Sequence, residues 1–240
     1  MLVSKIIVIL LCFILSGADL LAGPDQASED VYFSELRERM VDKQIVARGV
    51  EDQAVLAAML KVPRHEFVPR KLRILAYQDY PLAIGYDQTI SQPYIVALMS
   101  ELAQIGPEDQ VLEIGTGSGY QAAILAELAA QVYSMEILQP LAATSRQRLL
   151  GLGYQNIRVK CGNGYLGWSQ YAPYDAIIVT CAPEKVPAAL LGQLGLGGRL
   201  VIPVGASYQE LKVFTKTESG IEEQSIIPVR FVPMIKSGRN

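Results

Sequence analysis

The chain has 240 residues; half of them are hydrophobic, 19% are charged, and the formal net charge at pH 7 is −3. This length suits one large domain with a sizeable core, and the composition is that of a globular chain rather than a disordered one. The weakly negative charge, without any cluster of Lys and Arg along the chain, argues against nucleic acid as a partner.

The N-terminus has the pattern of a secretory signal peptide. Lys5 precedes an apolar run over residues 6–15, which is too short to span a bilayer comfortably, and small residues follow it. We therefore predict that residues 1–22 are a leader, cleaved after Ala18 or near Ala22. The mature chain would be exported to the periplasm with no stable membrane association. An uncleaved anchor or a misassigned start is the alternative interpretation.

Two helices are expected after a polar linker at residues 23–30. Apolar residues recur at helical spacing from residue 31 to Gly49, where the glycine ends the helix. A second helix, over residues 52–61, begins with an acidic residue and stops before Pro63. We expect both helices to form a cap on the main sheet.

Residues 63–93 show little periodicity, and a loop of this length is uncommon in a compact domain unless it serves function. His65, the only histidine, precedes an apolar anchor, so we assign it a structural or surface role rather than that of a general base. Pro93 opens a helix that runs to about Gln104 and puts Ser91 in position to cap its N-terminus.

From residue 106 onward, strands and helices alternate. Helices are expected at residues 120–130, 138–151 and 186–194, and strands at 111–114, 132–135, 157–161, 175–180 and 200–204, with an antiparallel hairpin at 210–216 and 225–234. The predicted fold class is therefore α/β, with a doubly wound, mostly parallel sheet and a helical N-terminal cap. We assign residues 31–240 to one domain, with the cap and a substrate loop at 31–105 and the sheet at 106–240.

The stretch VLEIGTGSGY, residues 111–120, predicts a buried strand that runs into a tight turn and a helix. Its glycines, Gly115, Gly117 and Gly119, would let the backbone approach a ligand closely, but their spacing does not match the dinucleotide fingerprint. Glu113, inside the strand, would repel a pyrophosphate and attract a cation. The pattern therefore favours S-adenosylmethionine, whose sulfonium and amino groups are positive, over NAD as the cofactor.

Two further segments would meet the same ligand, because the carboxyl ends of parallel strands share one edge of the sheet. Glu136 follows the second strand, where its carboxylate could accept both ribose hydroxyls of an adenosine. Gly162 and Asn163 follow the third strand, and the Asn163 amide oxygen could accept from the adenine amine. Together with the glycine turn, these residues predict a nucleoside site.

Cys161 and Cys181 are the cysteines outside the leader, and two cysteines make no metal site. Each ends a predicted strand, and the two strands are not expected to be neighbours. A chain with so large a core also needs no covalent staple. We therefore predict two small residues that are buried or line a cleft.

Five segments make the sequence similar to the protein-L-isoaspartate O-methyltransferase family: QTISQP at 88–93, VLEIGTGSGY at 111–120, YDAIIVTCAP at 174–183, GGRLVIPVG at 197–205 and VRFVPM at 229–234. The resemblance runs from about residue 31 to residue 234. It implies a seven-stranded methyltransferase fold in which the hairpin makes one strand antiparallel. It also implies a protein repair enzyme that transfers a methyl group from S-adenosylmethionine to the free carboxylate of isoaspartyl residues in proteins or peptides.

The resemblance also implies roles for residues of this chain. Ser91 matches the active-site serine of the family and would form the substrate groove with Val232 and Pro233. The family usually has Asp where this chain has Asn163, a change that keeps the acceptor oxygen and loses a charge. The residues that match cofactor contacts are Gln88, Thr89, Ile90, Ser91, Glu113, Ile114, Gly115, Thr116, Gly117, Glu136, Gly162 and Asn163.

The implied chemistry needs no general base. Some family members have histidine where this chain has Tyr94 or Val96. A carboxylate with a pKa of about 4 is already ionised at neutral pH, so it can attack the sulfonium methyl directly. The protein has to place the two groups in line and exclude water, and the Ser91 hydroxyl can hold one carboxylate oxygen.

Other interpretations stay open on the sequence. Thr180–Pro183 lacks the Asn/Asp-Pro-Pro-aromatic tetrad of nucleic-acid amino-methyltransferases, which argues against that class. A small-molecule methyltransferase and an exported, inactive binding module are the alternatives to protein repair. The cytoplasm is the alternative location, because family members generally act there, and the sequence does not indicate an oligomeric state.

Overall fold

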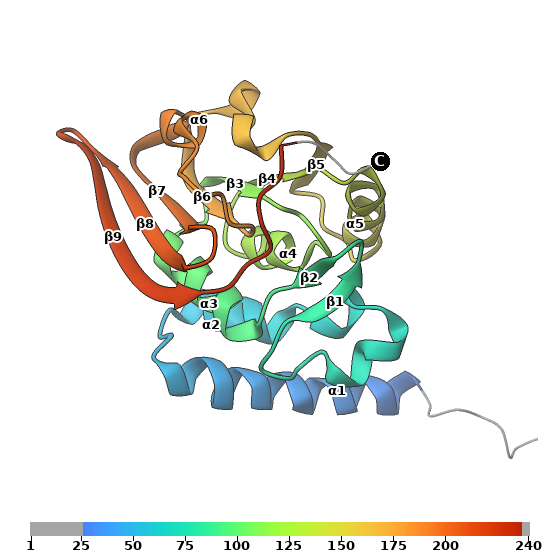
Figure 1. The fold of residues 1–240 in the computed structure, drawn as a ribbon. Helices are drawn as coiled ribbons and strands as arrows, with labels where there is room; N and C mark the ends of the chain where they lie inside the picture. Colours follow the sequence, from blue (N-terminus) through green and yellow to red (C-terminus); the bar gives the residue numbers. More distant parts are fainter. Residues whose placement is uncertain (1–25, 237–240) are drawn as a thin grey trace, which may run out of the picture.

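The computed structural model describes residues 26–236, which are built around one central sheet (Figure 1). Its strand order is β5-β4-β3-β6-β7-β8-β9. Strands β3 to β7 are parallel and β8 is antiparallel to both of its neighbours, so the predicted mostly parallel sheet with one antiparallel strand is confirmed. The strands are β3 (Gln110–Ile114), β4 (Gln131–Glu136), β5 (Ile157–Cys161), β6 (Tyr174–Val179), β7 (Leu194–Val204), β8 (Gln209–Thr217) and β9 (Gly220–Val229).

Both faces of the sheet are covered. Val111 and Leu112 are neighbours in β3 that point to opposite faces, and both are fully buried, in separate apolar clusters. This burial on two sides explains why the central strands have continuous apolar runs. One face is covered by α3 (Pro93–Ala103), α4 (Tyr120–Ala126) and α5 (Gln139–Gly151), and the other by α6 (Ala188–Gly192) and the 3₁₀ turns η5 (Gly164–Leu166) and η6 (Ser169–Tyr171).

The two predicted helices of the N-terminal cap are confirmed. Helix α1 (Gln26–Met40) continues through a π turn, η1 (Val41–Ile45), and a 3₁₀ turn, η2 (Val46–Arg48), before Gly49 with a φ of +84°. Helix α2 (Gln53–Lys61) follows, and the Asp52 carboxylate at its N-cap accepts hydrogen bonds from two backbone N–H groups. The apolar sides of the cap share one buried cluster with α4 and α5.

Residues 63–93 are more regular than the predicted loop. They form two 3₁₀ turns, η3 (Arg64–Phe67) and η4 (Arg70–Leu75), and an antiparallel hairpin of β1 (Leu82–Gly85) and β2 (Gln88–Ile90). The hairpin turn has a positive φ at Tyr86 (54°) and Asp87 (57°), which suits the twist of paired strands. A tyrosine is uncommon in that conformation, so the sequence gives no hairpin signal there.

Strand β9 ends at Val229, so the prediction that it continues to residue 234 is wrong. The Gln209 side chain bonds to both backbone polar groups of Phe231 and takes the place of a neighbouring strand. Its Oε1 accepts a hydrogen bond from Phe231 N–H at 2.6 Å, and its Nε2 donates to the Phe231 carbonyl at 3.1 Å. These two bonds hold Phe231, two residues after the end of β9, and so fix the direction in which the chain leaves the sheet.

Two other boundaries differ from the prediction. The helix expected over residues 186–194 is short, because β7 already begins at Leu194, which pairs with Tyr174. The N-cap of α3 is Gln92 rather than Ser91, and it makes no side-chain capping bond. Ser91 is thus not needed to cap the helix.

His65 has a structural role, as predicted. Only 7% of it is exposed, its ring stacks on Phe33 with centroids 3.9 Å apart, and its Nδ1 shares a 2.7 Å hydrogen bond with the Tyr77 hydroxyl. Burial, assisted by nearby Arg73, lowers the pKa of His65 to about 4. The ring is therefore neutral at pH 7 and belongs to the core of the cap.

The predicted leader, residues 1–22, lies outside the part of the chain that the structure describes, as does most of the linker at 23–30. None of the helices within residues 26–236 combines the length and the hydropathy that a membrane-spanning helix needs.

Candidate active site

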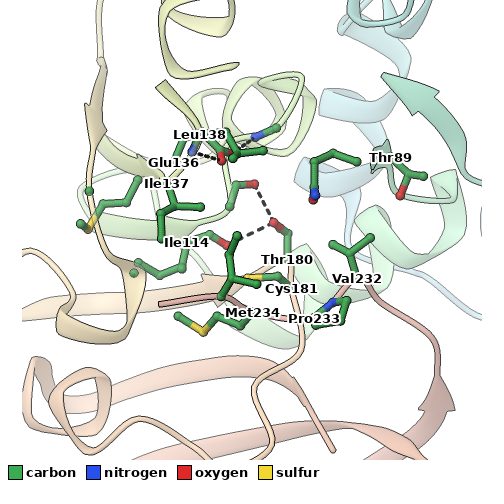
Figure 2. A pocket seen from close by; sticks show the side chains of 17 residues that line it. Thr89, Ile114, Glu136, Ile137, Leu138, Thr180, Cys181, Val232, Pro233 and Met234 are labelled. Atoms are coloured by element: carbon green, nitrogen blue, oxygen red, sulfur yellow. Dashed lines mark hydrogen bonds between the residues drawn. The ribbon is translucent and has the colours of Figure 1, made fainter. Parts of the chain in front are cut away.

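A cavity lies at the carboxyl ends of the central strands (Figure 2). The chain runs from β3 outward to β4 and β5, then returns to β6 on the other side of β3, so the strand order reverses there. Open α/β sheets bind their ligands at such a reversal. The cavity is lined by Gln88, Thr89, Ile114, Gly115, Gly117, Met135, Glu136, Ile137, Leu138, Gly162, Gly164, Thr180, Cys181, Val232, Pro233, Met234 and Ile235.

The turn after β3 can be built only with glycine at its first position. Gly115 has a φ of +100°, and a Cβ there would collide with Thr180 Oγ1. The Thr180 hydroxyl donates to the carbonyls of Gly115 at 2.6 Å and Ile114 at 3.1 Å, as the dashed lines in Figure 2 show. The end of β6 therefore holds the turn from one side.

Strand β4 holds the same turn from the other side. The N–H groups of Gly115 and Thr116 donate to the Met135 carbonyl at 2.7 and 3.2 Å. Gly117 N–H donates to Glu136 Oε2 at 2.8 Å. The N–H groups of Gly115, Thr116 and Gly117 are thus bonded inside the protein, while Gly115 and Gly117 line the cavity.

Glu136 lines the cavity and is only 6% exposed. Its Oε1 accepts a hydrogen bond from Leu138 N–H at 2.9 Å, and its Oε2 accepts the bond from Gly117. Each carboxylate oxygen can accept a second hydrogen bond, so the side chain is held in one orientation with capacity left for a ligand. Two neighbouring hydroxyls, such as those of a ribose, match this capacity.

Glu113 lies behind the glycine turn and does not line the cavity. It is fully buried, and its Oε2 accepts a hydrogen bond from the Ser134 hydroxyl, which also bonds to Thr116 Oγ1 at 2.5 Å. Burial raises the pKa of Glu113 to about 8; the Ser134 bond opposes this rise and the charge of Glu136 adds to it. At pH 7 the Glu113 carboxyl is therefore mostly protonated.

A second groove adjoins the cavity on the side of β2 and α3. Thr89, Thr180, Val232 and Pro233 line both hollows. The groove contains all three residues expected to meet a substrate, and no described residue makes a hydrogen bond with the Ser91 hydroxyl. Its lining is completed by Pro81, Ser91, Gln92, Ile95, Pro228, Val229, Arg230 and Phe231.

Arg64 fixes the Ser91 segment, and sequence reasoning missed it. The side chain is fully buried; its Nε donates to the Ala76 carbonyl and its Nη2 to the Ser91 carbonyl, each at 2.7 Å. The guanidinium also lies over the Tyr120 ring, 4.8 Å from its centroid. Burial lowers the pKa of Arg64 to about 10, which still leaves it charged at neutral pH.

A family model described as protein-L-isoaspartate(D-aspartate) O-methyltransferase matches residues 35–239. The chain belongs to this family. A protein-L-isoaspartate O-methyltransferase of Picosynechococcus sp. is 60% identical over 199 residues, which cover 83% of this chain and 90% of the relative.

Two solved structures show the same fold. One, titled protein-L-isoaspartate O-methyltransferase, is 29% identical with a TM-score of 0.74 and covers 84% of this chain; the match spans 65% of that protein. The other, a Plasmodium falciparum protein described as a putative protein-L-isoaspartate O-methyltransferase in complex with S-adenosyl-L-homocysteine, is 24% identical with a TM-score of 0.73. That match covers 85% of this chain and 99% of the Plasmodium chain.

The residues predicted from the sequence to contact the cofactor fall into two groups, those that line the methyltransferase cavity and those that do not. Gln88, Thr89, Ile114, Gly115, Gly117, Glu136 and Gly162 line it. Ile90, Ser91, Glu113, Thr116, Gly119 and Asn163 do not. Asn163 Oδ1 instead accepts a 2.9 Å hydrogen bond from Tyr165 N–H at the start of η5, so its contact with adenine stays a prediction.

The two cysteines differ from each other. Cys181 follows β6 and lines the cavity, as predicted, and burial raises the pKa of its thiol to about 12. Cys161 is exposed, which contradicts the prediction, because it ends the edge strand β5. Among residues 26–236, no group of three His, Cys, Asp or Glu side chains could hold a metal ion.

Three of the missed lining residues follow strands directly. Thr180 comes after β6, and Ile137 and Leu138 come after β4. The same edge rule that selected Glu136 would have selected them. Met234 has no such signal, because it reaches the cavity through a backbone bridge, with its N–H donating to the Ala182 carbonyl at 2.8 Å.

Replacing Gly115→Ala should reduce the free energy of unfolding by about 2–3 kcal/mol, because the new methyl group meets Thr180 at a positive φ. Gly151→Ala is the matched control, since Gly151 ends α5 with open space around it, and it should be neutral or slightly stabilising. Urea unfolding of both variants measures this. Equal stabilities of the two variants would contradict the argument.

Replacing Glu113→Gln should change how stability depends on pH. The unfolded carboxyl ionises near pH 4.5 and the folded one only near pH 8, so the folded state loses stability as the pH rises between these values. The glutamine variant lacks this loss. Its free energy of unfolding, relative to that of the parent, should therefore rise by about 2 kcal/mol or more from pH 5 to pH 8. Urea unfolding of the parent, Glu113→Gln and the control Glu108→Gln, whose residue is exposed, measures these free energies at pH 5 and pH 8. The same change in the free energy of unfolding between the two pH values for all three proteins would refute the prediction.

Proposed function

We propose that this chain is a protein repair enzyme that transfers a methyl group from S-adenosylmethionine to the free carboxylate of L-isoaspartyl residues in damaged proteins or peptides. Membership of the family supports the activity. The single structural observation that carries it is the junction of two hollows. The cavity with the glycine turn adjoins a groove containing Ser91, and Thr89, Thr180, Val232 and Pro233 line both.

The cavity residues fit an adenosyl cofactor. Ile114, Ile137 and Leu138 provide apolar surface suited to a flat adenine ring, and Glu136 has acceptor capacity for the ribose hydroxyls. The close approach of Gly115 and Gly117 leaves backbone rather than side chains facing the ligand. Once bound, S-adenosylmethionine supplies an electrophilic methyl group on a sulfonium.

The chain's own residues then have to position the acceptor. An isoaspartyl carboxylate has a pKa of about 4 and needs no base to become a nucleophile. The Ser91 hydroxyl, which no described residue engages, can donate to one carboxylate oxygen and leave the other facing the cavity. Ile95 and Phe231 add apolar surface to the groove that excludes water from the reacting groups.

Replacing Ser91→Ala should lower turnover on an isoaspartyl peptide about 10- to 100-fold, the value of one hydrogen bond to a charged group. Binding of S-adenosylmethionine, measured by calorimetry, should be retained because Ser91 does not line the cofactor cavity. Exposed Ser207→Ala is the control, and a normal aspartyl peptide is the control substrate. Unchanged turnover would remove Ser91 from the mechanism, and methylation of both peptides alike would contradict the proposed activity.

We also propose that the mature protein is exported to the periplasm. The support is the sequence of residues 1–18, a basic start followed by a short apolar run and small residues, and these precede residue 35, where the family match begins. N-terminal sequencing of the protein from fractionated cells should give a start after Ala18 or near Ala22. An intact Met1 on protein from the cytoplasmic fraction would contradict export.

A further inference from the structure

The groove beside Ser91 contains one charged side chain, Arg230, among its twelve lining residues. Its other polar members are uncharged: Thr89, Ser91, Gln92 and Thr180. Arg230 is exposed, and no described residue forms a hydrogen bond, an ion pair or a ring contact with it. A guanidinium with five donors and no partner, at the side of a binding groove, is suited to a planar carboxylate.

The backbone that carries Arg230 is held firmly. Gln209 bonds both polar groups of Phe231, the next residue in the chain. Ala182 N–H donates to the Val232 carbonyl at 2.8 Å, and the Ala182 carbonyl accepts from Met234 N–H at 2.8 Å. The segment cannot fold away from the groove without losing these bonds, so the backbone position of Arg230 is set before a ligand binds.

Arg230 also lies close to the reacting point. Val232, two residues further on, lines both the cavity and the groove. Two residues of chain span at most about 7 Å, so the Arg230 and Val232 Cα atoms lie no farther apart than this. A peptide in the groove with its methyl acceptor at the junction therefore brings side chains within about two residues of the acceptor into reach of Arg230.

Among the described residues that line the groove, no acidic side chain competes for Arg230. Asp79, which lies behind the groove, accepts hydrogen bonds from Gln92 and forms an ion pair with Arg48. Glu136, in the adjoining cavity, already accepts two backbone hydrogen bonds. The positive charge at this side of the groove is thus left for the substrate.

We propose that Arg230 forms a subsite that binds an acidic side chain, Asp or Glu, within about two residues of the isoaspartyl residue, and that the enzyme prefers such peptides. This inference rests on the proposed function, because it names the substrate class of the same site. Deamidated surface segments that carry neighbouring acidic residues are the substrates this chemistry selects. The attraction acts on binding, so it lowers KM rather than raising kcat.

The test uses a set of isoaspartyl peptides with Glu, Gln or Lys at each of the two positions on either side. With the wild-type protein, Glu should give a KM about two- to fivefold lower than Gln in at least one position, the range expected for an exposed charge pair. The advantage should shrink in high salt. In Arg230→Gln the KM ratio of the two peptides should fall to about one, and in Arg230→Glu the Lys peptide should become the better substrate.

Arg39→Gln is the matched control, because Arg39 is an exposed arginine of α1 that lines neither the cavity nor the groove. It changes the net charge equally and should keep the wild-type ratio. Equal ratios in the wild type, Arg230→Gln and Arg39→Gln would overturn the Arg230 subsite while leaving methyl transfer intact. Failure of the wild type to methylate even the Gln peptides would instead refute the proposed function, and the subsite with it.

Discussion

The shape of the cavity depends on the bonds that tie the turn after β3 to strand β4. Two amides of the turn donate to the Met135 carbonyl, and Gly117 N–H donates to the Glu136 carboxylate. Because parallel neighbours end at the same edge, these bonds close one wall of the cavity and orient Glu136 in the same step. Thr180 holds the opposite side of the turn, which leaves no room for a side chain on Gly115.

The wall that faces the substrate depends on a different interaction. A fully buried charge without a carboxylate partner is costly, and Arg64 offsets part of this cost by donating from Nε to the Ala76 carbonyl and from Nη2 to the Ser91 carbonyl. Its Nη1 has no hydrogen-bond partner among the described residues. Its third contact, with the Tyr120 ring, links the same side chain to the helix that follows the glycine turn. The N-terminal cap thus positions the Ser91 segment relative to the cofactor side of the site.

Local patterns in the sequence predicted the parts of the site that are local in the structure. The glycine turn and Glu136 follow directly from apolar strands that end in small or acidic residues, and the structure places both at the cavity. The Ser91 groove required the family resemblance. The bond between Arg64 and Ser91, and that between Gln209 and Phe231, join residues far apart in the chain, so no periodicity or spacing could indicate them.

The burial of Glu113 changes the electrostatic argument made from the sequence. There the acid in β3 was expected beside the positive cofactor, whereas the structure puts it behind the turn with a pKa of about 8. Among the described residues that line the cavity, Glu136 is the one acidic residue. A second ionised carboxylate beside the junction would repel the incoming isoaspartyl carboxylate. Keeping Glu113 protonated therefore leaves one acid to hold the cofactor, beside a groove in which Arg230 is the one charged residue among the described lining residues.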